Sequence, residues 1–144
     1  MYKRILLAYD GSQAGQKALL DCVELAQWSR AELFLVAVMP MPLTTIGPEG
    51  GIYGLETQEL ERKEFQQTLD TGLQRLRDAG LKAVGSLLSG DSVDAIVRSA
   101  QDNKADLIIV GHKHLDSWAQ RWWRGSVSRA LIEHAPCSVL VAII

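Results

Sequence analysis

The chain is poor in cysteine, in net charge and in long apolar runs, and each shortage excludes a class of protein. Its two cysteines, Cys22 and Cys137, form no spaced framework and sit inside apolar-periodic segments. We therefore expect reduced packing residues in a reducing compartment. The formal net charge of −2 provides no basic field that would draw the protein to nucleic acid or to a membrane surface. No apolar run approaches the roughly 20 residues that cross a bilayer.

The start of the chain also lacks the marks of a targeting segment. Met1–Ile5 enters a short apolar run at once, without a long hydrophobic region or a cleavage site. The 144 residues, 47% of them hydrophobic, are enough for one globular domain with its own core. We find no internal repeat and no low-complexity tract. The sequence predicts one soluble, cytoplasmic domain over residues 1–144.

Short apolar runs that are continuous rather than alternating predict the strands. Such runs are typical of strands buried on both faces, as in parallel sheets covered by helices. They are Ile5–Tyr9, Leu33–Val38 and Leu107–Val110, with a weaker run at Ala83–Leu88 and a last one at Ser138–Ile143.

The segments between these runs carry apolar residues three and four positions apart, which predicts helices. End signals support them: Gly80 suits a left-handed cap, Asp91 or Ser92 an N-cap, and Pro136 a stop. The four apolar stripes are Ala14, Ala18, Leu19, Cys22, Val23 and Ala26; Phe65, Leu69, Leu73, Leu76 and Ala79; Val93, Ile96, Val97 and Ala100; and Val127, Leu131 and Ile132.

The resulting order, β-α-β-α-β-α-β-α-β, predicts an α/β fold. We expect one doubly wound domain, a five-stranded parallel sheet with four helices and right-handed crossovers. Met39–Gly54 interrupts this alternation of strand and helix patterns, because it contains three prolines and four glycines. We interpret it as a mobile loop. Ligands of such sheets bind beyond the carboxyl ends of the strands, where the strand order reverses. The loops Asp10–Ser12 and Gly111–Gly125 should flank that crevice.

The second of these loops leads into a junction suited to an anion. Val110–His114 is a strand end with a glycine, and Arg124–Ser128 places hydroxyls at a helix start. The first N–H groups of a helix have no partner inside it, and the helix dipole favours negative charge. This junction is the strongest candidate for a binding site.

Other polar residues give weaker signals. His112 and His114 suit a metal only with a third ligand, which no nearby spacing supplies, so we expect exposed loop histidines. Asp10 either coordinates Mg²⁺ beside a nucleotide or caps the first helix together with Ser12, and the sequence leaves both open. Ser126 and Ser128 have no histidine with a sequence-supported role as their base.

Two further groups are candidates for surface roles. The tryptophans and arginines of residues 118–124 favour an amphipathic segment packed on the body over a nucleic-acid patch. Arg121 and Arg124 are alternatively placed to reach ligand phosphates. Four carboxylates spread around a predicted helix earlier in the chain and indicate a solvated face; they are Glu56, Glu59, Glu61 and Glu64.

Several stretches resemble the universal stress protein family, and the resemblance covers the whole chain. Tyr2–Ser12 is similar to the family's opening strand with its final Asp-Gly-Ser, and Asp91 begins a helix after a glycine, as is usual there. Ala105–Gly111 matches the strand before the family's binding loop. Gly125–Ser128, followed by His134–Val141, is close to family usage residue for residue.

The resemblance implies a Rossmann-like fold of the adenine nucleotide alpha hydrolase-like type. It also implies a stress-response module that binds ATP or AMP, with or without Mg²⁺, and at most hydrolyses ATP slowly. In nucleotide-binding relatives, the positions of Ala8 and Asp10 line base and ribose, and that of Val38 contacts adenine through its backbone. Gly111 lies near ribose and phosphates. The implied binding residues are Ala8, Asp10, Val38, Gly111, His112, His114, Gly125, Ser126, Val127 and Ser128, with no catalytic residue and no resident metal.

The chain departs from the family's motif, Gly-x2-Gly-x9-Gly-(Ser/Thr), at two points. His114 occupies the place of the second glycine, and thirteen residues separate Gly111 from Gly125, one more than in the motif. The extra residue either bulges out or shifts the loop into the phosphate path. Two functions therefore stay open: a nucleotide-binding module, or a dimeric interaction protein of the same fold that binds no nucleotide.

The last strand bears on assembly. Val139–Ile144 is apolar on both faces, and at a sheet edge it would offer unpaired backbone groups. Family members commonly pair this strand with its symmetry mate. The resemblance thus implies a homodimer through Val139 and Val141, while the physiological protein partner stays unknown.

Overall fold

The computed structural model describes residues 1–40, 50–113 and 127–144, which contain a five-stranded parallel sheet and four helices. The strands are β1 (Arg4–Ala8), β2 (Glu32–Met39), β3 (Ala83–Ser89), β4 (Leu107–His112) and β5 (Ser138–Ile143). The helices are α1 (Gln13–Ser29), α2 (Gly50–Asp78), α3 (Ser92–Asp102) and α4 (Val127–His134). The predicted order and the α/β class are confirmed.

The strand order is β3-β2-β1-β4-β5, so the direction of winding reverses between β1 and β4. Leu7 of β1 pairs with Leu35 of β2 on one side and with Ile109 of β4 on the other. β4 runs beyond this register, and its Gly111 and His112 pair only with β5. A crevice beyond the carboxyl ends of β1 and β4 follows from this arrangement.

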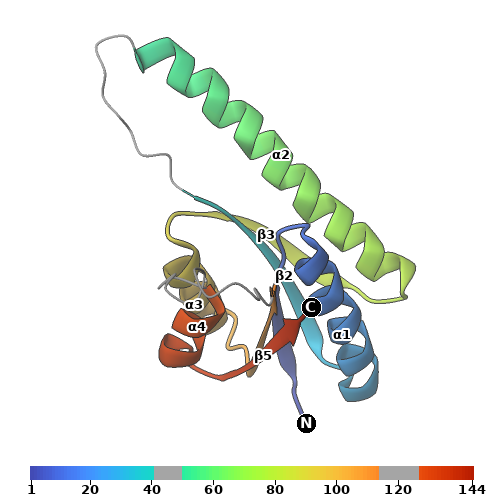
Figure 1. The fold of residues 1–144 in the computed structure, drawn as a ribbon. Coiled ribbons are helices and arrows are strands. Elements are labelled where there is room, and N and C mark those ends of the chain that lie inside the picture. Colours follow the sequence, from blue (N-terminus) through green and yellow to red (C-terminus); the bar gives the residue numbers. More distant parts are fainter. Residues whose placement is uncertain (41–49, 114–126) are drawn as a thin grey trace.

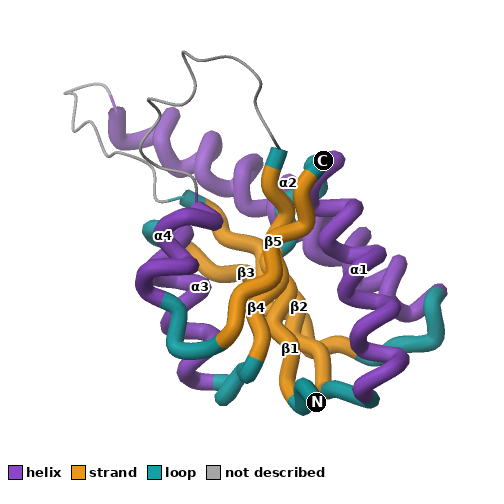
Figure 2. Tube along the Cα trace, turned by 60° about the horizontal axis from the view of Figure 1, so that its bottom comes forward, coloured by secondary structure: helices purple, strands orange, loops and turns teal. Residues whose placement is uncertain are grey.

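The helices cover both faces of the sheet, α1 and α2 on one and α3 and α4 on the other (Figures 1 and 2). Successive residues of β1 therefore face different layers. Ile5 and Leu7 pack in a first cluster with α1 and α2, whereas Leu6 packs in a second cluster with α3 and α4. Both faces are buried, which explains why the strand sequences are continuous rather than alternating.

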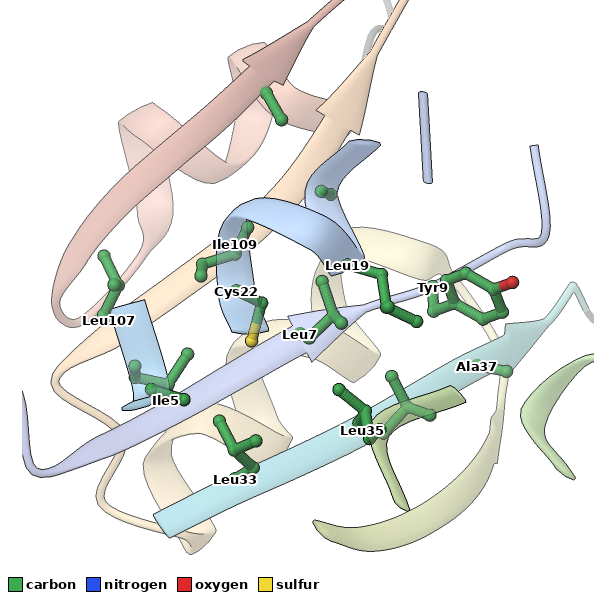
Figure 3. Packing of buried hydrophobic residues seen from close by; sticks show 14 of the residues in the cluster. Ile5, Leu7, Tyr9, Leu19, Cys22, Leu33, Leu35, Ala37, Leu107 and Ile109 are labelled. Atoms are coloured by element: carbon green, nitrogen blue, oxygen red, sulfur yellow. The ribbon is translucent and has the colours of Figure 1, made fainter. Parts of the chain in front are cut away.

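The first cluster is the larger of the two (Figure 3). Leu19 and Cys22 of α1 lie over Leu7 and Ile109 there, and all four side chains are at most 3% exposed. Cys22 is an unpaired thiol that fills space beneath α1, and Cys137 is also unpaired, as the sequence predicts.

Helix ends are set by the residues that the sequence indicates. Ser12 is the N-cap of α1, and its Oγ accepts a hydrogen bond from the Gly15 N–H at 3.0 Å. Asp91, rather than Ser92, caps α3 by accepting from the Asp94 N–H. Gly80, at φ +80°, follows α2 in the left-handed conformation that glycine adopts without strain.

The bounds predicted for the loop Met39–Gly54 are wrong at both ends. Met39 is the last residue of β2, and the segment from Gly50 onward already belongs to α2; residues 41–49 lie outside the described residues. Glycine inside a helix costs only about 1 kcal/mol, so a glycine-rich stretch can still continue a helix whose later turns are well packed. The later turns of α2 bury Leu69 and Leu76 against the sheet.

The stripe predicted for α4 is also only partly buried. Leu131 is fully buried, but Ile132 is 65% exposed and Val127 38% exposed. One residue per turn is enough to anchor this short helix beside α3. Within the described ranges, no helix has both the length and the apolar content to span a bilayer.

Candidate functional site

A cleft lies at the carboxyl ends of β1, β2 and β4, on the side covered by α3 and α4, with a volume of about 560 Å³ that includes its open mouth. Its place is the point where the strand order reverses, as the topology predicts. The residues that line it are Ala8, Tyr9, Asp10, Val36, Val38, Ser92, Ile96, Val110, Gly111, Val127 and Ser128.

The lining has an apolar part and a polar part. Val36 and Val38 of β2 and Ile96 of α3 supply aliphatic surface. Asp10 and Ser128 supply a carboxylate and a hydroxyl. A mostly apolar cleft with a few convergent polar groups is the usual form of a small-molecule site.

A second hollow continues the cleft toward the start of α1. It shares Asp10, Gly111, Val127 and Ser128 with the cleft and adds Ser12, Gln13, Ala14, His112, Lys113 and Ile144. The amino-terminal ends of α1 and α4 both border it, and Lys113 brings a positive charge. This hollow therefore suits an anionic group attached to a ligand in the cleft.

Asp10 holds the start of α1 in place. Its Oδ1 accepts hydrogen bonds from the Ser12 N–H at 3.0 Å and the Ser12 O–H at 2.6 Å. A Cβ on Gly15 would lie 2.6 Å from the same oxygen, so only glycine leaves room for this carboxylate. The helix-capping role foreseen for Asp10 and Ser12 is confirmed, with Ser12 as the cap and Asp10 as its support.

Gly111 is required by packing as much as by any ligand. A Cβ at this position would lie 2.2 Å from the Ala14 carbonyl oxygen and 2.7 Å from the Gly15 nitrogen. The end of β4 thus lies directly against the backbone of α1, which the sequence reading did not foresee.

His112 and Ser128 form the polar contact that joins β4 to α4. The Ser128 Oγ lies 3.1 Å from the His112 Nδ1, and the Ser128 side chain is buried. The expectation of an exposed loop histidine is wrong for His112, because β4 continues through this residue and half-buries it. No histidine had a sequence-supported role beside Ser128, and the longer β4 is what brings the His112 ring to the start of α4.

The structure brings together most of the residues predicted for the site. Ala8, Asp10, Val38, Gly111, Val127 and Ser128 line the cleft, and His112 lines the adjoining hollow. His114, Gly125, Ser126 and the tryptophans and arginines of residues 118–124 lie outside the described residues.

Five residues of the lining were not predicted from the sequence: Tyr9, Val36, Ser92, Ile96 and Val110. Val36 was within reach, because it lies two residues before Val38 and so on the same face of β2. Whether Ser92 and Ile96 line the cleft depends on where α3 crosses the sheet, and no local sequence pattern predicts that position.

Among the described residues, the carboxylates of α2 do not line the cleft. Of the four carboxylates predicted to form a solvated face, Glu56, Glu59 and Glu64 are exposed on α2, whereas Glu61 is half-buried. Among the residues that the structure describes, no three side chains of histidine, cysteine, aspartate or glutamate are grouped to hold a metal ion.

Comparison with known proteins identifies the family. The profile of the Universal stress protein family matches residues 1–142. The chain belongs to this family. A Staphylococcus epidermidis protein that carries the family's name is 35% identical over 143 residues, which cover 97% of this chain and 83% of the relative.

Solved structures of the family share the fold. A family member from Burkholderia pseudomallei is 29% identical, with a TM-score of 0.76 over 97% of this chain and 95% of that one. A universal stress protein solved in complex with cAMP is 24% identical, with a TM-score of 0.69 over 97% and 95% of the two chains. An Arabidopsis thaliana member with AMP bound is 16% identical, with a TM-score of 0.70 over 98% and 91%.

Proposed function

We propose that this protein is a nucleotide-binding module of the stress response, and that it binds an adenine nucleotide, ATP or AMP, in the cleft between β1 and β4. The observation that carries the proposal is the form of the cleft, which has aliphatic walls at one end and Asp10, Gly111 and Ser128 at the other. The family members solved with cAMP and AMP support it, because they have the same fold.

The proposed pose follows from the chemistry of the lining. The flat, largely apolar faces of adenine fit between Val38 and Ile96, near Ala8. Asp10 is an acceptor for ribose hydroxyls. The phosphates point toward Ser128 in the first turn of α4, where helix N–H groups and the helix dipole favour negative charge. The predicted phosphate contacts from Gly125 and Ser126 belong to this proposal, and so does His114 as a binding residue in place of the family's second glycine.

A magnesium ion would enter with ATP rather than occupy a site of its own. Mg²⁺ is commonly held by one or two carboxylates together with substrate phosphates. Asp10 is the described carboxylate that lines the cleft, and its Oδ1 is engaged by Ser12. Its second oxygen is the group that we assign to such an ion.

We infer a binding role rather than catalysis, with slow ATP hydrolysis as the upper limit. The His112–Ser128 pair resembles the first two members of a nucleophilic triad, which additionally needs a third group that orients the base. Stress-response regulation through a nucleotide-dependent change of partners needs no such triad.

The edge position of β5 favours self-association as a second part of the function. β5 pairs with β4 on one side and ends the sheet on the other; its last residue, Ile143, is 54% exposed, and the next residue, Ile144, is 40% exposed. An unpaired strand edge promotes aggregation, and proteins prevent this by covering the edge or pairing it with another strand. We propose a two-fold homodimer through Val139 and Val141, in the cytoplasm, where Cys22 and Cys137 stay reduced.

Analysis of co-purified ligand tests the nucleotide proposal. The purified protein is denatured by heat, and the supernatant is separated by chromatography and assayed for adenine nucleotides. We expect AMP or ATP from the native protein and none from Ala8→Leu, because the larger side chain fills the apolar end. Val84→Ala, an exposed change at the far sheet edge, serves as the matched control. Equal nucleotide from Ala8→Leu and the control would place the ligand elsewhere.

A further inference from the structure

Tyr9 lies between two residues of the cleft, but its side chain packs on the opposite face of the sheet. Its neighbours in the sequence, Ala8 and Asp10, both line the cleft. Successive residues of an extended strand point to opposite faces, so the Tyr9 side chain turns toward α1 and α2. It is buried there in the first cluster, together with Leu35 (Figure 3). The Tyr9 N–H donates to the Val36 carbonyl oxygen at 2.9 Å, so pairing with β2 continues through this residue.

A chain of hydrogen bonds links the Tyr9 hydroxyl to both helices. The side-chain amide of Gln16, on α1, donates through Nε2 to the Tyr9 Oη. Its Oε1 accepts from the guanidinium of Arg75, on α2. A guanidinium can only donate, so the amide oxygen must face Arg75 and the amide nitrogen must face Tyr9. The orientation of Gln16 is therefore fixed, and the Tyr9 oxygen is the acceptor at the end of the chain.

One face of α2 also packs against the chain on either side of Asp10. Thr68 and Gly72 are four residues apart and so lie on the same face of this helix. A Cβ on Gly72 would lie 2.9 Å from the Tyr9 Cδ1, and a Cβ on Gly11 would lie 3.2 Å from the Thr68 Cγ2. The residues before and after Asp10 are thus both in close contact with α2, which limits how far the backbone of Asp10 can move.

We propose that Tyr9 is a positioning residue of the cleft, whose anchorage on α1 and α2 fixes the Asp10 carboxylate where it accepts from ribose hydroxyls. The inference rests on the proposed nucleotide function and adds the groups that set the affinity for the ribose. The Tyr9 side chain acts through the backbone that it shares with Asp10. Ser12 fixes the same carboxylate from the other side, through two hydrogen bonds to its Oδ1. A carboxylate that is already ordered binds more tightly, because less conformational freedom is lost on binding.

The test compares AMP with 2′,3′-dideoxy-AMP, which keeps the base and the phosphate but lacks both ribose hydroxyls. The ratio of the two affinities, measured by calorimetry, reports the contact between Asp10 and the ribose. We expect the native protein to bind AMP at least about tenfold more tightly, the value of one hydrogen bond to a charged group. Tyr9→Phe keeps the ring but loses the hydroxyl, so it should lower this ratio at least about threefold. A loss of stability alone would lower both affinities equally and leave the ratio unchanged.

Two substitutions of Gln16 separate the hydrogen bonds from the packing. Gln16→Met has a similar length but no hydrogen-bonding amide, so it should lower the ratio as Tyr9→Phe does. Gln16→Glu keeps an acceptor for both the Tyr9 O–H and the Arg75 guanidinium, so it should keep the native ratio. Tyr2→Phe, the same chemical change on the other side of β1, is the matched control and should behave as the native protein. A ratio that falls equally in Tyr2→Phe and Tyr9→Phe would contradict the assignment.

The outcomes separate this inference from the function on which it rests. Absence of binding by AMP, 2′,3′-dideoxy-AMP and Mg-ATP would refute the nucleotide proposal and this inference with it. Equal affinities of the native protein for AMP and its dideoxy form would refute only the positioning role, since no ribose contact would exist to be positioned. A native ratio that Tyr9→Phe leaves unchanged would likewise refute the role of Tyr9 and leave nucleotide binding standing.

Discussion

Gly111 packs against the carbonyl group of Ala14 so closely that a Cβ at residue 111 would lie 2.2 Å from that oxygen. The neighbouring atoms belong to the helix backbone and cannot turn aside as a flexible side chain would. Gly111→Ala should therefore lower the free energy of unfolding by about 1–3 kcal/mol, the range for overpacking. Urea denaturation measures the loss.

A double variant shows whether the clash with the backbone of α1 causes this loss of stability. Ala14→Gly removes a side chain but leaves the carbonyl group, so adding it to Gly111→Ala should not restore stability. If Gly111→Ala is as stable as the native protein, β4 does not lie against α1 as described.

The sequence predicted the architecture well because parallel strands buried on both faces have an unmistakable composition. All five runs became strands, and Ser12, Gly80 and Asp91 mark helix ends as their chemistry requires. The predicted boundaries of the elements were less accurate. β4 runs two residues past Val110, since its pairing with β5 continues through His112. Pairing between strands that are far apart in the sequence produces no local sequence pattern from which the end of a strand could be predicted.

The candidate site was predictable where it follows the strand ends and not where it depends on helix placement. Asp10 and Gly111 lie beyond neighbouring strands, so topology alone brings them together. The contact between His112 and Ser128 joins residues 16 positions apart in the sequence, and no rule of residue spacing predicts it.

The two thiols should differ in reactivity. Burial raises the pKa of Cys22 to about 12, and burial and the nearby Asp106 charge raise that of Cys137, which is only half-buried. Thiolates are the reactive species, so Cys137 should react first and Cys22 only after unfolding. Labelling with a chromogenic disulfide, with Cys137→Ser as control, measures both rates. Two equally fast thiols in the folded protein would be inconsistent with a buried Cys22.

Asp106 should contribute to stability in a pH-dependent way. Desolvation raises the pKa of its carboxyl, but the N–H groups of Lys3 and Arg4, which donate to it at 2.8 and 3.0 Å, more than offset this and leave the pKa below its usual range. A depressed folded-state pKa stabilises the protein above the unfolded pKa, and the stabilisation is lost as the pH falls through the folded value.

Comparing the native protein with Asp106→Asn separates the contribution of this carboxyl to stability from that of the other acidic side chains. The variant should be less stable than the native protein at neutral pH, and the gap should narrow below about pH 4, where aspartate carboxyls take up protons. Urea denaturation across this range measures the gap. A gap that keeps its size down to acid pH would rule out the proposed role of the charge.

The proposed dimer predicts a mass that depends on β5. The native protein should have twice the mass of one chain at micromolar concentration, and Val141→Lys should shift it toward the monomer, because lysine opposes pairing at a strand edge. Val84→Lys, on β3 at the opposite edge, should leave the mass unchanged. Light scattering gives the masses, with circular dichroism as the check on folding. A monomeric native protein would remove the dimer proposal.

Calorimetric titration with AMP, ADP and Mg-ATP tests the central claim most directly. The cleft should give saturable binding with a dissociation constant below about 1 mM, equivalent to at least about 4 kcal/mol of binding free energy. His114→Gly, which restores the family's residue, should bind at least as tightly as the native protein. Saturable heat from the native protein is the predicted result. No heat from any of the three nucleotides, for either the native protein or His114→Gly, would contradict nucleotide binding and favour the dimeric interaction protein.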